Sequence, residues 1–82
     1  MAKRVKKRIM FTYTPELVHE PIIYNLSQEF NIVTNIHLAD IAEDRGWVML
    51  ELEGEEDKIE QGLAWAISRG MRVDSAGEDN LR

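Results

Sequence analysis

The spacing of apolar residues changes repeatedly along this chain of 82 residues, and the order of those changes constrains the fold more than any other feature. Residues 4–13 end in an alternation of apolar and polar side chains, the period of two that indicates a strand. Residues 14–30 then place apolar side chains three or four positions apart, and Thr14 with Pro15 is typical of a helix start. Because Pro21 interrupts that pattern, we expect either a kink there or a helix that begins near it.

The rest of the chain repeats this order with one additional strand. Residues 31–43 and 47–53 alternate as strands do, and Glu43–Gly46 between them has the composition of a hairpin turn. A second helix pattern follows and ends at Gly70, a residue suited to the position after a helix. Residues 71–75 then predict a short last strand.

The second helix carries one apolar stripe and one residue that does not fit it. The predicted inward residues are Ile59, Leu63, Ala66 and Ile67. Trp65 lies nearly opposite that stripe, so we expect it to be exposed, packed beneath a terminus, or used in a contact.

This order of elements predicts an α+β fold of the ferredoxin-like βαββαβ type. Right-handed crossovers place both helices on one face of a four-stranded antiparallel sheet, with the second strand at an edge. The other face then has no cover within the chain. Because the chain is short, we expect a single domain over residues 1–82, with fraying at 1–3 and 77–82.

The uncovered face of the sheet is where we expect the functional surface. If Val48, Leu50 and Leu52 contact the helices, Trp47 and Met49 must face away from them. On the second strand the expected inward residues are Ile36 and Leu38, and the expected outward residues are Asn35, His37, Ala39 and Ile41. An exposed apolar patch of this kind marks an interface or a ligand site.

The distribution of charge argues against some partners. The net charge is −5, yet five of the ten basic residues lie within the first eight positions. From residue 9 onward the chain holds 5 basic and 15 acidic side chains, which disfavours nucleic acid or an anionic membrane as the main partner. RNA-recognition folds share this topology, but Glu51 and Glu53 would repel phosphate. We interpret the basic start as a solvated arm that protects the sheet edge.

No pattern of residues supports catalysis, metal binding or a cofactor. Cysteine is absent, which excludes disulfides, thiolate zinc sites and iron–sulfur clusters. His19 and His37 do not converge with other ligands as a tetrahedral metal site requires, and no serine has a histidine and an acid arranged around it. No apolar run approaches the roughly 20 residues of a spanning helix, and no signal peptide is evident. We therefore expect a cytoplasmic, non-enzymatic domain.

Several short motifs together resemble the NIL domain family over residues 4–75. They are Phe30-Asn31-Ile32-Val33-Thr34-Asn35-Ile36, Gly46 opening the third strand, Leu52-Glu53-Gly54 closing it, Ala64-Trp65 in the second helix and Pro21-Ile22-Ile23 in the first. The resemblance implies a regulatory module, because NIL domains form the C-terminal part of bacterial methionine-importer ATPase subunits, where they pair, bind methionine and inhibit transport. Since this chain has no Walker motif and no cysteine, ATPase and cluster chemistry do not carry over.

The resemblance predicts a non-catalytic domain that senses methionine or another amino acid at a homodimer interface, because an open sheet alone cannot enclose a ligand. Asn35 and Ile36 match the family motif, whereas the next position, commonly aliphatic in the family, is His37 and favours a ligand other than methionine. The predicted ligand-binding residues are Asn35, Ile36, His37, Trp47 and Met49, and the predicted interface residues are Val33, Ala39 and Ile41. The alternative is a protein–protein interaction module that uses the open face without a small ligand.

Overall fold

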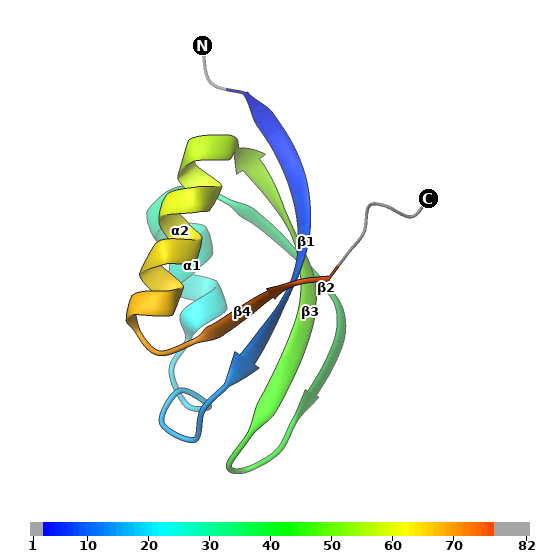
Figure 1. Cartoon of the computed structure of the whole chain (residues 1–82), viewed down its shortest axis with the longest axis vertical. Coiled ribbons are helices and arrows are strands. Elements are labelled where there is room, and N and C mark those ends of the chain that lie inside the picture. The colour runs from blue at the N-terminus through cyan, green and yellow to red at the C-terminus, as the bar shows by residue number, and fades with distance from the viewer. Residues whose placement is uncertain (1–2, 77–82) are drawn as a thin grey trace.

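The computed structural model describes residues 3–76, which form the predicted succession of strands and helices. The elements are β1 (Arg4–Tyr13), α1 (Ile22–Phe30), β2 (Val33–Ile41), β3 (Gly46–Glu55), α2 (Glu56–Ser68) and β4 (Arg72–Ser75). The antiparallel sheet has the order β2-β3-β1-β4, and both helices cover the same side of it (Figure 1). The predicted ferredoxin-like fold, with β2 at an edge, is therefore confirmed. The fraying expected at 1–2 and 77–82 lies outside the described residues, whereas the Lys3 carbonyl accepts a hydrogen bond from Glu56 N–H at 2.7 Å.

The first helix begins later than Thr14, because Pro21 determines its start. Residues 15–19 form turns instead of a first helical turn. Proline has no N–H and its ring clashes with a preceding turn, so it is tolerated only where a helix begins. α1 starts at Ile22, and the Pro21 carbonyl accepts a hydrogen bond from Asn25 N–H at 2.9 Å. Of the two expected outcomes, the later start is the one observed.

The second helix ends at a glycine, as predicted. Gly70 has a φ of 104°, in the left-handed region where glycine has no steric cost. Its N–H donates to the Ile67 carbonyl at 2.9 Å, and the Met71 N–H donates to the Ala66 carbonyl at 3.0 Å. These two bonds form a Schellman motif, which satisfies carbonyls at the helix end and turns the chain into β4.

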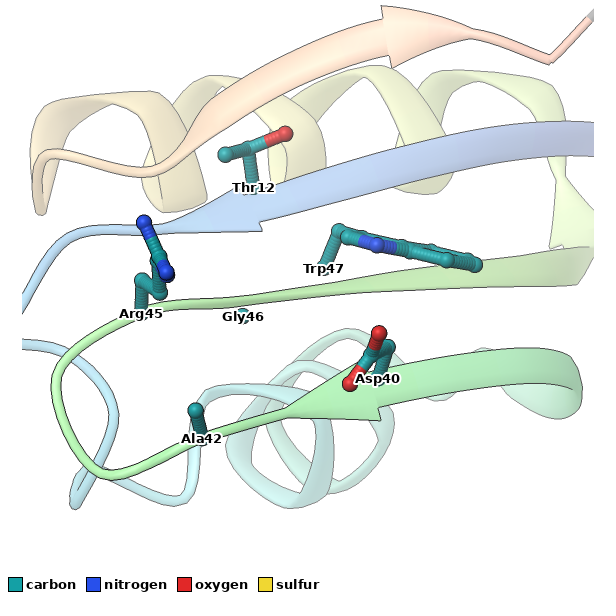
Figure 2. A pocket seen from close by; sticks show the side chains of 6 residues that line it. All are labelled: Thr12, Asp40, Ala42, Arg45, Gly46 and Trp47. Carbon is teal, nitrogen blue, oxygen red and sulfur yellow. The ribbon is translucent and has the colours of Figure 1, made fainter.

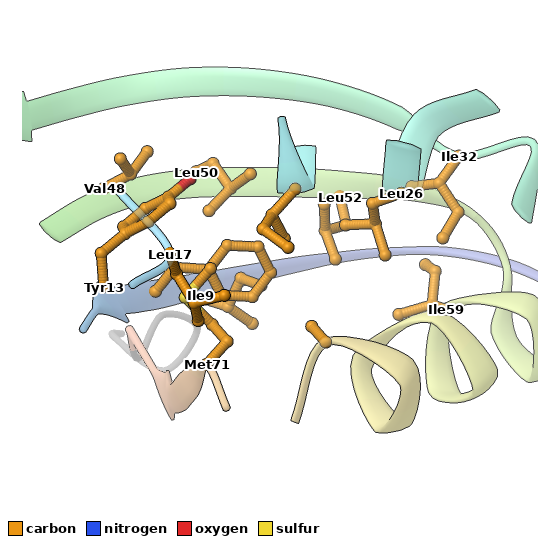
Figure 3. Packing of buried hydrophobic residues seen from close by; sticks show 13 residues of the cluster. Ile9, Tyr13, Leu17, Leu26, Ile32, Val48, Leu50, Leu52, Ile59 and Met71 are labelled. Atoms are coloured by element: carbon orange, nitrogen blue, oxygen red, sulfur yellow. The ribbon is translucent and has the colours of Figure 1, made fainter. Parts of the chain in front are cut away.

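The core fills the space between the helices and the sheet (Figure 3). Its buried side chains alternate along the central strands, with Ile9, Phe11 and Tyr13 from β1 and Val48, Leu50 and Leu52 from β3. The helices add Ile22, Leu26, Ile59 and Ala66. Burial raises the pKa of Tyr13, because a phenolate would be poorly solvated among these side chains.

The buried stripe of α2 includes Gly62, which a search for hydrophobic side chains does not identify. The buried residues of this helix are Ile59, Gly62 and Ala66. A Cβ at Gly62 would lie 2.7 Å from Leu26 Cδ1, so the missing side chain is what lets α1 approach. Because this line faces the core, Ile67 turns outward and is 56% exposed, and its predicted inward position is wrong.

Trp65 packs at the margin of the core between the two helices. Its ring centroid lies 5.9 Å from that of Phe30, and the guanidinium carbon of Arg69 lies 5.9 Å from the centroid of the Trp65 ring. Arg69 also donates to a Glu20 carboxylate oxygen at 2.5 Å. This cluster ties the segment before α1 to the end of α2, so the role of Trp65 is structural.

Two glycines of β3 provide a matched test of how closely the strands pack. A Cβ at Gly46 would lie 2.9 Å from Ile41 Cα, a backbone atom that cannot move alone, whereas a Cβ at Gly54 would meet only ordinary contacts of 3.6 Å or more. We expect Gly46→Ala to destabilise the fold by about 1–3 kcal/mol. Gly54→Ala should leave stability unchanged or slightly higher. Urea unfolding of both variants checks this, and equal stabilities would contradict it.

Candidate functional site

The side of the sheet away from the helices, called here the open face, has an apolar half. Residues directly opposite each other in an antiparallel sheet point to the same side, so the pairing register assigns them to faces. One row across the four strands is Asp40, Trp47, Thr12 and Arg72, and the next is Leu38, Met49, Met10 and Asp74. This half of the face therefore has a sulfur-rich, aromatic centre with charged side chains at its margins.

The other half of the open face is a ladder of opposite charges. Arg8 lies opposite Glu51, Lys6 opposite Glu53, and Arg4 opposite Glu55. No direct ion pair joins these side chains within the described residues, so their attraction acts across the strands at longer range. The basic start of the chain, interpreted from the sequence as a solvated arm, is thus a strand whose acidic complement lies on β3.

A β-bulge at His37 reverses, for the residues that follow it, which side chains of β2 reach the open face. Ile36 pairs with Leu50 and Leu38 pairs with Met49, which leaves His37 as one extra residue between them. The observed open-face residues of β2 are Val33, Asn35, Leu38 and Asp40, and the helix-side residues are Thr34, Ile36, Ala39 and Ile41. The predictions that Leu38 faces inward and that Ala39 and Ile41 face outward are wrong for this reason.

The predicted ligand-binding residues do not line one cavity. Asn35 and Trp47 both lie on the open face, but their rows are four residues of β3 apart, about 13 Å at the usual rise of a strand. Met49 lies between those rows, Ile36 points to the helix side, and His37 sits in the bulge. Any single ligand that contacts both Asn35 and Trp47 must therefore reach them from two different chains or span the face.

A shallow cavity of about 210 Å³ lies at the Trp47 end of the open face (Figure 2). Its lining residues are Thr12, Asp40, Ala42, Arg45, Gly46 and Trp47. The indole of Trp47 lies along its strand beside the Asp40 carboxylate (Figure 2). Neither Asp40 nor Arg45 forms an ion pair with another residue in the range 3–76, so the cavity presents two opposite, unpaired charges. Such a cavity suits a small zwitterion that carries an apolar group.

Sequence reasoning identified Trp47 but missed the two charged residues of this cavity. Asp40 reaches the open face only because of the bulge, and a bulge has no signature in the alternation of β2. Arg45 belongs to the hairpin turn, where a charged residue is usual and draws no notice. The one available signal for a charged site was that Asp40 and Arg45, of opposite charge, lie on either side of the tip of the hairpin.

The edge strand β2 exposes apolar side chains on both of its sides. Val33, Ile36, Leu38 and Ile41 are 49%, 58%, 58% and 52% exposed. No residue in the described part of the chain pairs with the outer edge of this strand. Long apolar edge strands associate with other strands unless they are protected, so β2 is a candidate surface for another chain.

Within residues 3–76, no group of three or more histidine and acidic side chains is arranged to hold a metal ion. No helix of this part is long and apolar enough to cross a membrane.

Comparison with known proteins identifies similar sequences and folds. The model of the NIL domain family matches residues 7–75. The chain is 30% identical over 73 residues to the methionine import ATP-binding protein MetN of Mannheimia succiniciproducens, a match that covers 84% of this chain and 21% of that protein. The fold resembles the crystal structure of the C-terminal domain of an ABC transporter ATP-binding protein from Enterococcus faecalis, with a TM-score of 0.78, 21% identity, and coverage of 89% of this chain and 86% of that one. The chain thus spans about one fifth of the MetN relative.

The charge ladder predicts that the two charges of a cross-strand pair can be swapped without loss of stability, whereas two like charges in one pair destabilise the fold. Because Arg8 lies opposite Glu51, Arg8→Glu places two carboxylates across from each other and should cost roughly 0.2–1 kcal/mol of unfolding free energy. The double variant Arg8→Glu with Glu51→Arg should recover most of that loss. Chemical unfolding in low and high salt measures both effects, and additive losses in the double variant would contradict the pairing.

Proposed function

Because this chain belongs to the NIL domain family, we propose that it is a non-catalytic regulatory domain that pairs with a second copy through β2 and senses a free amino acid on the cytoplasmic side of a membrane. Its similarity to part of a methionine import ATP-binding protein supports amino-acid recognition in a transport context. The observation that carries the proposal is the apolar, unpaired edge of β2 among the described residues.

The exposed residues of β2 offset much of the free-energy cost of forming a dimer. Completing the burial of a half-exposed aliphatic side chain contributes roughly 0.8–1.5 kcal/mol, half the value for full burial. Four such residues on each of two chains contribute about 6–12 kcal/mol, which is comparable to an association cost of about 4–15 kcal/mol. Backbone hydrogen bonds between the two edges then fix the alignment, since an antiparallel pair of identical strands is related by a two-fold axis.

Pairing of this kind would bring the separated site residues together. When two copies of β2 run antiparallel about their middles, the first half of one strand lies beside the second half of the other. Asn35 of one copy would then border the Asp40 and Trp47 cavity of its partner. In this arrangement Asp40 accepts hydrogen bonds from the ligand ammonium, Arg45 donates to its carboxylate, and Trp47 contacts its side chain.

The energies of these contacts are consistent with a sensor for an abundant metabolite. Each hydrogen bond to a charged group contributes about 1.5–3 kcal/mol. Millimolar binding requires only about 4 kcal/mol, which two such bonds supply without full enclosure of the ligand.

Oligomeric state tests the pairing surface. We expect the protein to be a dimer by light scattering at about 100 µM, a concentration at which a complex of micromolar Kd is formed. Ile36→Lys with Leu38→Lys should give a monomer, because charges replace the apolar edge. Ile67→Lys is the matched control, since Ile67 is equally exposed on α2 and should leave the dimer intact. A monomeric wild-type protein would overturn the proposed dimer.

Thermal-shift measurements with the twenty amino acids test the sensor. A ligand at ten times its Kd stabilises the fold by about 1.4 kcal/mol, which raises the Tm of a domain this small by roughly 6–11 °C. Asn35→Ala and Asp40→Asn should abolish the shift, and Glu16→Gln, at an exposed loop position, should retain it. A flat response from an intact dimer would instead favour the protein–protein interaction module.

A further inference from the structure

Two methionines lie directly opposite each other in the apolar half of the open face. Met10 of β1 is the pairing partner of Met49 of β3, so both side chains project from the sheet on the side away from the helices. Each is half-buried, whereas Met71 belongs to the core and is 3% exposed. Because the chain has no cysteine, its methionines supply all of its sulfur. The open face therefore presents two neighbouring thioethers with no thiolate in the chain to compete with them.

The spacing of this pair suits a single ion held between the two sulfurs. Side chains directly opposite each other in an antiparallel sheet have Cβ atoms about 4.5–5.5 Å apart. An ion that lies about 2.3 Å from each sulfur, the length of a zinc–sulfur bond, spans about 4.6 Å. Since a methionine side chain has three rotatable bonds, its sulfur can reach that position without movement of the strand. Thioether ligands of this kind suit soft ions such as Cu(I).

Trp47 places an aromatic ring beside the same pair. It is the next residue of β3 on the open face, on the hairpin side of Met49. Its indole lies along the strand and points away from Arg45 and Gly46, which is the direction of Met49 (Figure 2). Two residues of a strand span about 6.6 Å, a distance that an indole side chain covers. An ion at the two sulfurs is therefore within reach of the ring, whose face attracts cations.

The charges around the pair also suit a cation. Asp74 of β4 lies directly opposite Met10, and its Oδ2 accepts a hydrogen bond from Arg72 Nε at 3.0 Å. On the other side, the partner of Met49 is the apolar Leu38. One carboxylate that is already shared with a guanidinium gives weak attraction, which fits an ion of single charge better than a divalent one.

We propose that Met10 and Met49 bind one soft monovalent metal ion, Cu(I) or Ag(I), between their thioether sulfurs, with the indole of Trp47 against it. The site differs from the amino-acid cavity, which the two methionines do not line. It also lies within one chain, so it depends neither on a second copy nor on an amino acid.

Titration of Ag+ into the full-length chain, labelled with 13C at its methionine methyl groups, tests the proposal by NMR. Silver nitrate in chloride-free buffer is the probe, because Ag+ is stable in air. We expect the methyl signals of Met10 and Met49 to move together, to saturate at one ion per chain and to give a Kd of roughly 1–100 µM. The Met71 signal should not move, because its side chain is buried. Zn2+, a harder ion, should leave the Met10 and Met49 signals unchanged.

Substitutions of similar volume separate loss from gain of a ligand. Met10→Leu and Met49→Leu should each weaken Ag+ binding at least tenfold, because leucine keeps the apolar surface and removes the sulfur. Leu38→Met adds a third thioether opposite Met49 and should tighten binding several-fold. Trp47→Leu should weaken binding several-fold through loss of the ring. Met71→Leu is the matched control and should change the affinity less than about twofold.

Four results would each overturn the proposal. They are unchanged affinity in the Met10 and Met49 variants, which would place the ion at a histidine, saturation at two ions per chain with independent movement of the two methyl signals, an equal response to Zn2+, and no movement of either signal at millimolar Ag+. The last result would leave the methionines as an apolar surface only.

Discussion

Two helices cover one face of a four-stranded sheet, and this one-sided burial determines the character of every remaining surface. All the core side chains of β1 and β3 point toward α1 and α2, where Gly62 lets the helices approach each other. The alternation of a strand then sends its other residues to the open face. A domain this small buries a modest fraction of its surface, so the open face and the two sheet edges are large relative to the core.

The bulge at His37 is the second constraint, and it acts on both faces at once. Without the extra residue, β2 would keep its first alternation throughout and direct Leu38 and Asp40 toward the helix side. With it, the strand changes faces midway. The open face gains a carboxylate beside Trp47, and the helix side of the edge gains Ile41. Apolar side chains lie on both sides of this exposed strand, with Val33 and Leu38 on the open face and Ile36 and Ile41 on the helix side.

The order of elements was predictable because period, turn composition and helix ends depend on local sequence. The alternation at Val48, Leu50 and Leu52 and the helix end at Gly70 are of this kind. The predictions that were wrong concern features that depend on contacts between residues distant in the sequence. Whether α2 turns Ile67 or Trp65 toward α1 is decided by close packing at Gly62, which has no hydrophobic side chain. Whether Asp40 joins the site is decided by its pairing with Trp47, since the alternation of β2 alone places it on the wrong face.

The two edges of the sheet differ in a way that limits how far the domain can assemble. A sheet with two apolar edges adds copies at both ends, and such growth has no closed end. Here the β2 edge is apolar, whereas the first half of β1 carries Lys6, Lys7 and Arg8. A second copy is favoured at the β2 edge and opposed by the cations of β1, so the proposed pairing through β2 would stop at a closed two-fold dimer.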